Sequence, residues 1–205
     1  NQLNENENEN NKNREYPGVD ARISETYIKH STAQKTKLYD MYTRFIRWAS
    51  DRLAEDGVIA FITNRSFLDA RSFDGFRKVV ADEFSDIYVV DLGGDVPKTP
   101  HLPGPKHNVF AIQTGVAISF FVKDTARAGQ PARIHYARRP EMETAREKLH
   151  FLATTPLAEI AFEHIQPNWR HTWINQVEHN WEDLLPVGTK GTKLAKRPTD
   201  EQAIF

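Results

Sequence analysis

The polar residues best placed to take part in chemistry come directly after a short apolar strand. Thr63, Asn64, Arg65 and Ser66 follow the run Val58–Ile62, which no polar residue interrupts. Open α/β sheets bind their ligands at the carboxyl ends of the strands, because loops from neighbouring strands meet there. The sequence therefore predicts a ligand site at the end of this strand.

Three other kinds of site have little support. A metal ion would need closely spaced ligands, and the candidate histidines form neither a helical pair nor a set framed by carboxylates; they are His164, His171 and His179. A nuclease centre would need clustered carboxylates, whereas Asp82 and Glu83 fit the solvated face of a helix. A phosphate-binding glycine loop joins a strand to a helix, but Gly93-Gly94 leads into a proline-rich loop. We therefore expect no metal ion and no nucleotide-binding glycine loop in this sequence.

The strand is expected to follow an amphipathic helix within the stretch Lys37–Ser66. The apolar positions of this helix recur at steps of three and four, which indicates one buried face; they are Leu38, Met41, Tyr42, Phe45, Ile46, Ala49 and Leu53. Gly57 stands where a left-handed residue would end the helix. Val58–Ile62 shows no alternation, so we expect both faces of the strand to be covered, as in a parallel sheet between helices.

The next stretch repeats the order of helix and strand. Phe67–Phe84 predicts a helix capped by Ser72 or Asp69, and Ile87–Leu92 predicts a second apolar strand. A strand, a helix and a strand so close together indicate parallel strands joined by a right-handed crossover. Residues 93–107 contain four prolines and three glycines, so we expect an irregular loop there.

The later part of the sequence predicts a hairpin and then a change of character. Asn108–Val122 indicates a strand that is interrupted at residues 113–115, and the short link predicts antiparallel pairing with the strand before it. After residue 123 we expect an edge strand at Arg133–Ala137, a helix at Pro140–Ala153 with proline in its first turn, and a short helix at Pro156–Ile165. Residues 166–205 have few periodic runs and resemble the beginning of another module.

The composition excludes several classes of protein. The chain has 205 residues, of which 39% are hydrophobic and 11% aromatic, which is sufficient for a folded core. It contains no cysteine, which rules out thiolate zinc sites and a cysteine nucleophile, and its net charge of -1 does not indicate a globally basic protein. No apolar run approaches the roughly 18 residues that cross a bilayer. With its Asn/Glu-rich opening, the chain looks like an excerpt from a longer protein. We also expect no membrane partner and a cytoplasmic location.

Three stretches resemble a known family of enzymes. They are KLYDMYTRFIRWASDRLAEDGVIAFITNRSFLDARSFDGFRK, DIYVVDLGGDV and KHNVFAIQTGVAISFFV. These stretches are similar to the methylase part of the large single-polypeptide restriction-modification enzymes called Type ISP, whose methylases are gamma-type adenine-N6 DNA methyltransferases. The resemblance extends over about the first 125 residues and is loose beyond them.

The resemblance implies an α/β fold, namely the C-terminal half of a class I, Rossmann-like methyltransferase sheet that ends in an antiparallel hairpin. It divides the chain into a polar tract at residues 1–15, the methyltransferase part at 16–125, a connection at 126–165 and the start of a target-recognition region at 166–205. The implied cofactor is S-adenosylmethionine, and the implied partner is double-stranded DNA. The upstream half of the methyltransferase, a helicase module and a nuclease module would belong to the same polypeptide.

The resemblance also assigns roles to individual residues. Leu38 and Tyr42 match a helix that packs beside the cofactor, where Tyr42 would line the adenine pocket or serve as a core aromatic residue. Phe110 matches an aromatic residue that stacks on the target adenine after the base leaves the duplex, because the exocyclic amine is inaccessible inside the helix; the alternative is a core position. Basic residues near these positions are the DNA-binding candidates; they are Arg65, Lys98, Lys106 and His107.

Two motifs that the family uses are missing from the sequence. It contains neither the glycine-rich cofactor loop nor the Asn-Pro-Pro-Tyr motif that binds the reacting amine. We therefore expect the chain by itself to be catalytically incomplete as a DNA adenine-N6 methyltransferase. The alternative function is a non-catalytic α/β module that binds DNA or another protein.

Overall fold

The computed structural model describes residues 15–33, 38–94, 107–112 and 114–175. All of them belong to the first of two compact units, Asn1–Asn175, and the second unit is Gln176–Phe205. Most of the predicted module at 166–205 and nearly all of the polar tract at 1–15 therefore lie outside the described residues. Within the described ranges, no helix has the length and apolar composition needed to span a bilayer.

The described residues form a sheet with the strand order β1-β3-β2-β4-β5. The strands are β1 (Gly57–Asn64), β2 (Asp86–Asp91), β3 (Val116–Lys123), β4 (Arg133–Arg138) and β5 (Glu163–Ile165). β3 runs antiparallel to both β1 and β2, β2 and β4 are parallel, and β5 runs antiparallel to β4. This topology confirms the predicted α/β class and the antiparallel pairing of β2 with β3.

The neighbours of two strands differ from the prediction. β1 and β2 point in the same direction, but they do not pair because β3 lies between them. β4 is not an edge strand, since β5 pairs with its outer side. The segments predicted separately as 16–125 and 126–165 therefore share one hydrogen-bonded sheet through the β2–β4 ladder.

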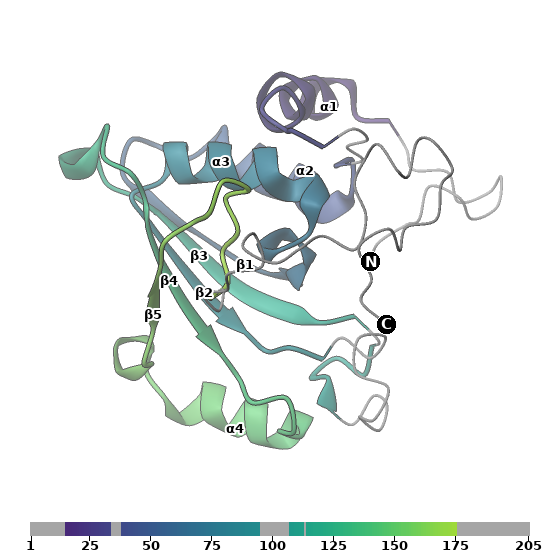
Figure 1. Ribbon diagram of the computed structural model, residues 1–205, viewed down its shortest axis with the longest axis vertical. Helices are drawn as coiled ribbons and strands as arrows, with labels where there is room; N and C mark the ends of the chain where they lie inside the picture. The colour runs from purple at the N-terminus through teal and green to yellow at the C-terminus, as the bar shows by residue number, and fades with distance from the viewer. Residues whose placement is uncertain (1–14, 34–37, 95–106, 113, 176–205) are drawn as a thin grey trace, which may run out of the picture. The chain divides into compact units, whose positions relative to one another are not determined.

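Helices cover both faces of this sheet. α1 (Pro17–Ile23), α2 (Met41–Ser50) and α3 (Asp74–Glu83) lie together on one side of the sheet, and α4 (Ala145–Thr154) lies apart from them (Figure 1). The larger core joins α1–α3 to residues of the sheet such as Ile87, Val89 and Phe121. A second cluster forms where Phe151 and Leu152 of α4 pack against β2 and β3.

The coverage of β1 is incomplete within the described part of the chain. Ile59 is buried, but Val58 and Ile62 on the alternate positions are 58% and 56% exposed. The expectation that both faces of this strand are covered is therefore wrong for the described residues, because α2 and α3 cover one face only. Phe45, which was expected on the buried face of α2, is also exposed.

The end of α2 corrects the expected role of Gly57. The helix ends at Ser50, where the amides of Arg52 and Leu53 both donate to the carbonyl oxygen of Ala49 at 3.0 Å. Gly57 instead opens β1, and a Cβ atom there would lie 2.6 Å from Cδ1 of Leu53. Gly57 does not adopt the left-handed conformation of a helix cap, and the terminal methyl of Leu53 is flexible enough to make room for a side chain there.

Three other predicted helices have different boundaries. The stretch 67–84 begins with 3-10 turns at Arg65–Leu68 and Arg71–Phe73 before α3, and neither predicted residue caps α3, whose N-cap, Phe73, makes no side-chain capping bond. α4 begins after a capping box formed by Thr144 and Glu147, so Pro140 lies before the helix. The helix predicted at 156–165 is a 3-10 turn, Leu157–Glu159, followed by β5.

Asp74 connects the start of α3 to the segment that follows α1. Its carboxylate accepts hydrogen bonds from the Thr32 amide at 2.7 Å, the Thr32 hydroxyl at 2.6 Å and the Ser31 hydroxyl. Burial alone would raise the pKa of Asp74, but the hydrogen bonds from Ser31, Thr32 and Gly75 hold the pKa below its ordinary value. The ionised form is therefore the one that the folded chain favours.

The D74N variant is expected to flatten the acid dependence of stability. A carboxyl whose pKa is lowered by folding stabilises the fold above its unfolded pKa, and this contribution is lost as the pH falls through the folded pKa. The free energy of unfolding of D74N, measured in urea, should change less than that of the parent between about pH 5 and pH 2. D82N, which alters an exposed carboxylate paired with Lys78, is the control; equal slopes for D74N and the parent would contradict the assignment.

Candidate functional site

A pocket of about 790 Å³ lies at the carboxyl end of β1, between α2 and the turn at residues 107–112. We call residues 107–112 the aromatic turn because it carries Phe110. The lining is mostly apolar and aromatic, with a few polar groups at the strand end, which is the usual composition of a small-molecule site. The lining residues are Met41, Tyr42, Phe45, Phe61, Ile62, Thr63, Asn64, Phe110, Ile112, Thr114 and Val116.

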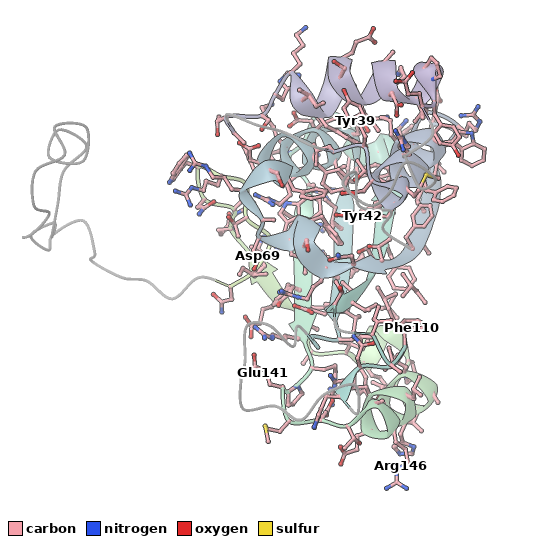
Figure 2. All side chains as sticks on the ribbon, turned by 90° about the vertical axis from the view of Figure 1, so that its right-hand side faces the viewer. Tyr39, Tyr42, Asp69, Phe110, Glu141 and Arg146 are labelled. Carbon is pink, nitrogen blue, oxygen red and sulfur yellow. The ribbon has the colours of Figure 1, made fainter. Side chains whose placement is uncertain are left out.

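Tyr42 and Phe110, to which the resemblance gave separate roles, line this same pocket. Figure 2 labels both residues. The ring of Tyr42 stacks on Phe73 with a centroid distance of 5.8 Å and an interplanar angle of 13°. Burial raises the pKa of the Tyr42 hydroxyl, so the phenol stays neutral at physiological pH. Tyr42 therefore serves both the core and the pocket.

Phe110 is presented to solvent by the aromatic turn. The predicted strand at 108–122 begins only at Val116, so Phe110 is not a strand residue. The residue is 54% exposed, and its amide donates to Oδ1 of Asn108 at 2.9 Å. Nδ2 of Asn108 donates to the carbonyl oxygen of Thr114 at 2.7 Å, and Ala111 adopts a positive φ of 54°. The core alternative for Phe110 is therefore wrong, and its exposure leaves the ring free to stack on a ligand.

Leu38 lies in the hydrophobic core and not in the pocket. It is completely buried among the residues that join the helices to the sheet. A contact between Leu38 and a cofactor stays a prediction.

Arg65 occupies a buried ion pair in place of an exposed position. Its Nε lies 2.9 and 3.0 Å from the two carboxylate oxygens of Asp91, and the pair is 5% and 0% exposed at the side chains. The Tyr136 hydroxyl donates to Oδ2 of Asp91 at 2.7 Å, and the Gly93 amide donates to Oδ1 at 2.8 Å. This geometry gives Arg65 a structural role, and a DNA contact by its side chain stays a prediction.

Of the other predicted DNA-binding residues, the structure describes only His107. Lys98 and Lys106 lie outside the described residues. His107 begins the aromatic turn, and its Nδ1 lies 2.9 Å from the carbonyl oxygen of Glu143. Of the three histidines weighed as metal ligands, His179 lies outside the described ranges; within those ranges, no three His, Asp or Glu side chains come together to hold a metal ion.

The sequence did not single out several members of the pocket. Met41 and Phe45 were assigned to a buried helix face, although both line the pocket. Ile112 was assigned to a strand, yet it is 45% exposed in the aromatic turn. The proline-rich loop before Asn108 was the available signal that Ile112 lies outside a strand, since irregular structure can continue for several residues after such a loop.

The fold and pocket thus define an α/β protein with an aromatic ligand site at a strand end. No family model matches the chain, and no curated protein matches it. Solved structures do. A cryo-electron microscopy structure of a DrdV–DNA complex is 47% identical, with a TM-score of 0.76, over 91% of this chain and 18% of that chain.

Two further solved structures carry the name of the group that the sequence resembles. A nuclease-deletion mutant of the Type ISP restriction-modification enzyme LlaGI, in complex with a DNA substrate mimic, is 35% identical, with a TM-score of 0.77, over 92% of this chain and 18% of that chain. The ATP-dependent Type ISP restriction-modification enzyme LlaBIII, bound to DNA, is 35% identical, with a TM-score of 0.73, over 88% of this chain and 12% of that chain.

These identities, together with the shared fold, make the chain homologous to a segment of Type ISP restriction-modification enzymes. The chain spans less than one fifth of the length of each of the three proteins. The predicted resemblance is confirmed for this group of enzymes, whereas the matches do not say which activity the matching segment carries.

Proposed function

We propose that this chain forms part of a site-specific adenine-N6 DNA methyltransferase within a bacterial restriction-modification enzyme. One observation carries the proposal: Tyr42 and Phe110 line a single pocket at the carboxyl end of β1. The resemblance assigned one of these residues to the cofactor and the other to the target base. Methyl transfer requires cofactor and base to be neighbours, and a shared pocket suits that requirement.

The composition of the pocket fits a planar, partly polar ligand. Its volume of about 790 Å³ and its aromatic lining suit a purine ring, and the polar groups of Thr63, Asn64 and Thr114 suit the edge of such a ring. S-adenosylmethionine, when bound, supplies a methyl group on a positively charged sulfur. The residues of this chain would stack on the flat rings and exclude water from them. The groups that bind the reacting amine are not in this sequence and would come from elsewhere in a longer polypeptide.

Replacing Phe110 with alanine tests the proposal in a polypeptide that includes the missing motifs. Stacking of a base on an aromatic side chain is worth about 1–3 kcal/mol, so we expect F110A to lower the kcat of methyl transfer to DNA by about tenfold or more. Transfer of radiolabelled methyl from S-adenosylmethionine to duplex DNA is the measurement. W48A, which removes an aromatic side chain of α2 that is 51% exposed outside the pocket, should leave the rate unchanged.

Two results would contradict this proposal. One is a parent polypeptide, complete in both missing motifs, that neither binds S-adenosylmethionine nor transfers methyl groups. The other is an F110A variant as active as the parent. A loss of activity that W48A reproduces would indicate a general effect on folding in place of base stacking.

A second candidate is a non-catalytic module that binds DNA or another protein. Each of the three similar structures contains DNA or a DNA mimic, and this favours a DNA contact by the segment to which this chain corresponds. A module of this kind would leave the methyl-transfer assay blank, while the 205-residue chain would bind duplex DNA in a salt-dependent manner through phosphate contacts.

A further inference from the structure

We propose that Lys148 of α4 is a positioning residue, whose buried amine holds the aromatic turn so that Phe110 projects at the pocket. This inference rests on the proposed function for the purpose that it gives to Phe110. The contact itself does not depend on that function. The contact joins α4, which was predicted to be part of a connecting segment, to the aromatic turn that carries Phe110.

The contact made by Lys148 is unusual for a lysine. The residue is 1% exposed, and its Nζ donates to the carbonyl oxygen of His107 at 2.7 Å. Among the described residues, Lys148 forms no ion pair. Burial lowers the pKa of its amine. The carboxylates of Glu143 and Asp91 offset part of this shift. An ammonium group withdrawn from water without a directly paired carboxylate still costs the fold stability.

A second contact holds the same end of the turn. Nδ1 of His107 lies 2.9 Å from the carbonyl oxygen of Glu143, just before α4 begins. The side chain of Asn108 then bridges the Phe110 amide and the Thr114 carbonyl oxygen inside the turn. Phe110 is therefore three residues from an anchor on α4 and two residues from an internal clamp.

The position of α4 does not need this contact. Phe151 and Leu152 pack against Val90 and Val116 on the sheet, and the capping box of Thr144 fixes the start of the helix. Loss of the Lys148 amine should therefore make the aromatic turn more mobile and leave α4 in place. Figure 2 shows α4, which carries the labelled Arg146, next to the part of the molecule that carries Phe110.

The chain's lack of cysteine allows a direct measurement of the turn. Ile112→Cys, at a position that is 45% exposed, gives a single site for a nitroxide spin label in the aromatic turn. We expect the electron paramagnetic resonance spectrum to report faster motion when K148M is added. K78M, which removes a half-buried lysine of α3 that pairs with Asp82, should leave the spectrum unchanged. Circular dichroism melting establishes that each labelled chain is folded.

A conservative variant keeps the test decisive. K148Q retains an N–H donor, and we expect it to restrict the label more than K148M does. A folded K148M chain whose label moves as slowly as that of the parent would overturn the proposal. If neither variant folds, Lys148 is a stability element and the proposal is likewise overturned.

The methyl-transfer assay separates this inference from the proposed function. Because a misplacement of about 1 Å can lower a rate by about 100-fold, we expect K148M in the longer polypeptide to lower kcat by about tenfold or more while the KM for DNA changes little. A parent without methyl transfer would defeat the proposed function but leave the result with the label standing. A parent that transfers methyl, loses activity with F110A and keeps it with K148M would defeat the positioning role alone.

Discussion

Replacing Asp91 with alanine is expected to destabilise the folded chain by about 3–5 kcal/mol, as is typical when one partner of a buried ion pair is removed. Asp91 is completely buried at the end of β2 and accepts hydrogen bonds from Arg65, Tyr136 and the Gly93 amide. The variant takes the buried carboxylate away from the guanidinium of Arg65 and the acceptor away from the Tyr136 hydroxyl. Folded domains are stable by only about 5–15 kcal/mol, so this loss is a large part of the total.

Urea denaturation of D91A and of a surface control measures the effect. D82A removes an exposed carboxylate that lies 2.9 Å from Nζ of Lys78, and pairs of this kind contribute about 1 kcal/mol or less. A D91A variant no less stable than D82A would show that the Arg65–Asp91 pair is structurally dispensable. Arg65 would then again be a reasonable candidate for a DNA contact.

The Arg65 pair also shows where prediction from the sequence fails. Locally, Asn64-Arg65 looks like a polar strand end that faces a ligand. The guanidinium is instead turned to a carboxylate 26 residues further along the chain. Strand pairing brings Arg65 and Asp91 together, and no periodic pattern in the sequence near either residue predicts this contact. The sequence therefore locates the strand end correctly, while the direction of a side chain there depends on long-range contacts.

The elements themselves were easier to predict than their pairing. The apolar runs at 58–62 and 87–92 closely match β1 and β2, although only β2 has the burial on both faces that a continuous apolar run indicates. The insertion of β3 between them could not be predicted, since antiparallel pairing with either neighbour satisfies the same pattern. Tyr42 and Phe110 were found by resemblance, whereas the exposed turn that carries Phe110 depends on hydrogen bonds of Asn108.

Replacing Arg77 with methionine is expected to cost about 2–4 kcal/mol, because hydrogen bonds from a charged group contribute about 1.5–3 kcal/mol each and water can replace some of them. Arg77 is completely buried, and its guanidinium donates to four backbone carbonyl oxygens at 2.8–2.9 Å. Burial lowers the pKa of Arg77 to about 10, so the group stays charged at neutral pH. The acceptors come from two distant segments; they are Phe67, Ala70, Arg170 and His171.

The distribution of these acceptors predicts which part of the chain loosens first in R77M. Phe67 and Ala70 precede α3 directly. The segment 170–173 has local hydrogen bonds to Asn168, and Trp173 joins it to the turns before α3, since the Trp173 amide donates to the carbonyl oxygen of Leu68 at 2.9 Å. Trypsin should therefore cleave R77M after Arg170 faster than it cleaves the parent, at urea concentrations where both are folded. R71M, which removes an exposed arginine from the same region, should change stability by less than about 0.5 kcal/mol. A destabilised R77M variant without faster cleavage after Arg170 would contradict this expectation. Arg77 would then stabilise mainly the turns before α3, and water would replace its hydrogen bonds to the carbonyl oxygens of Arg170 and His171.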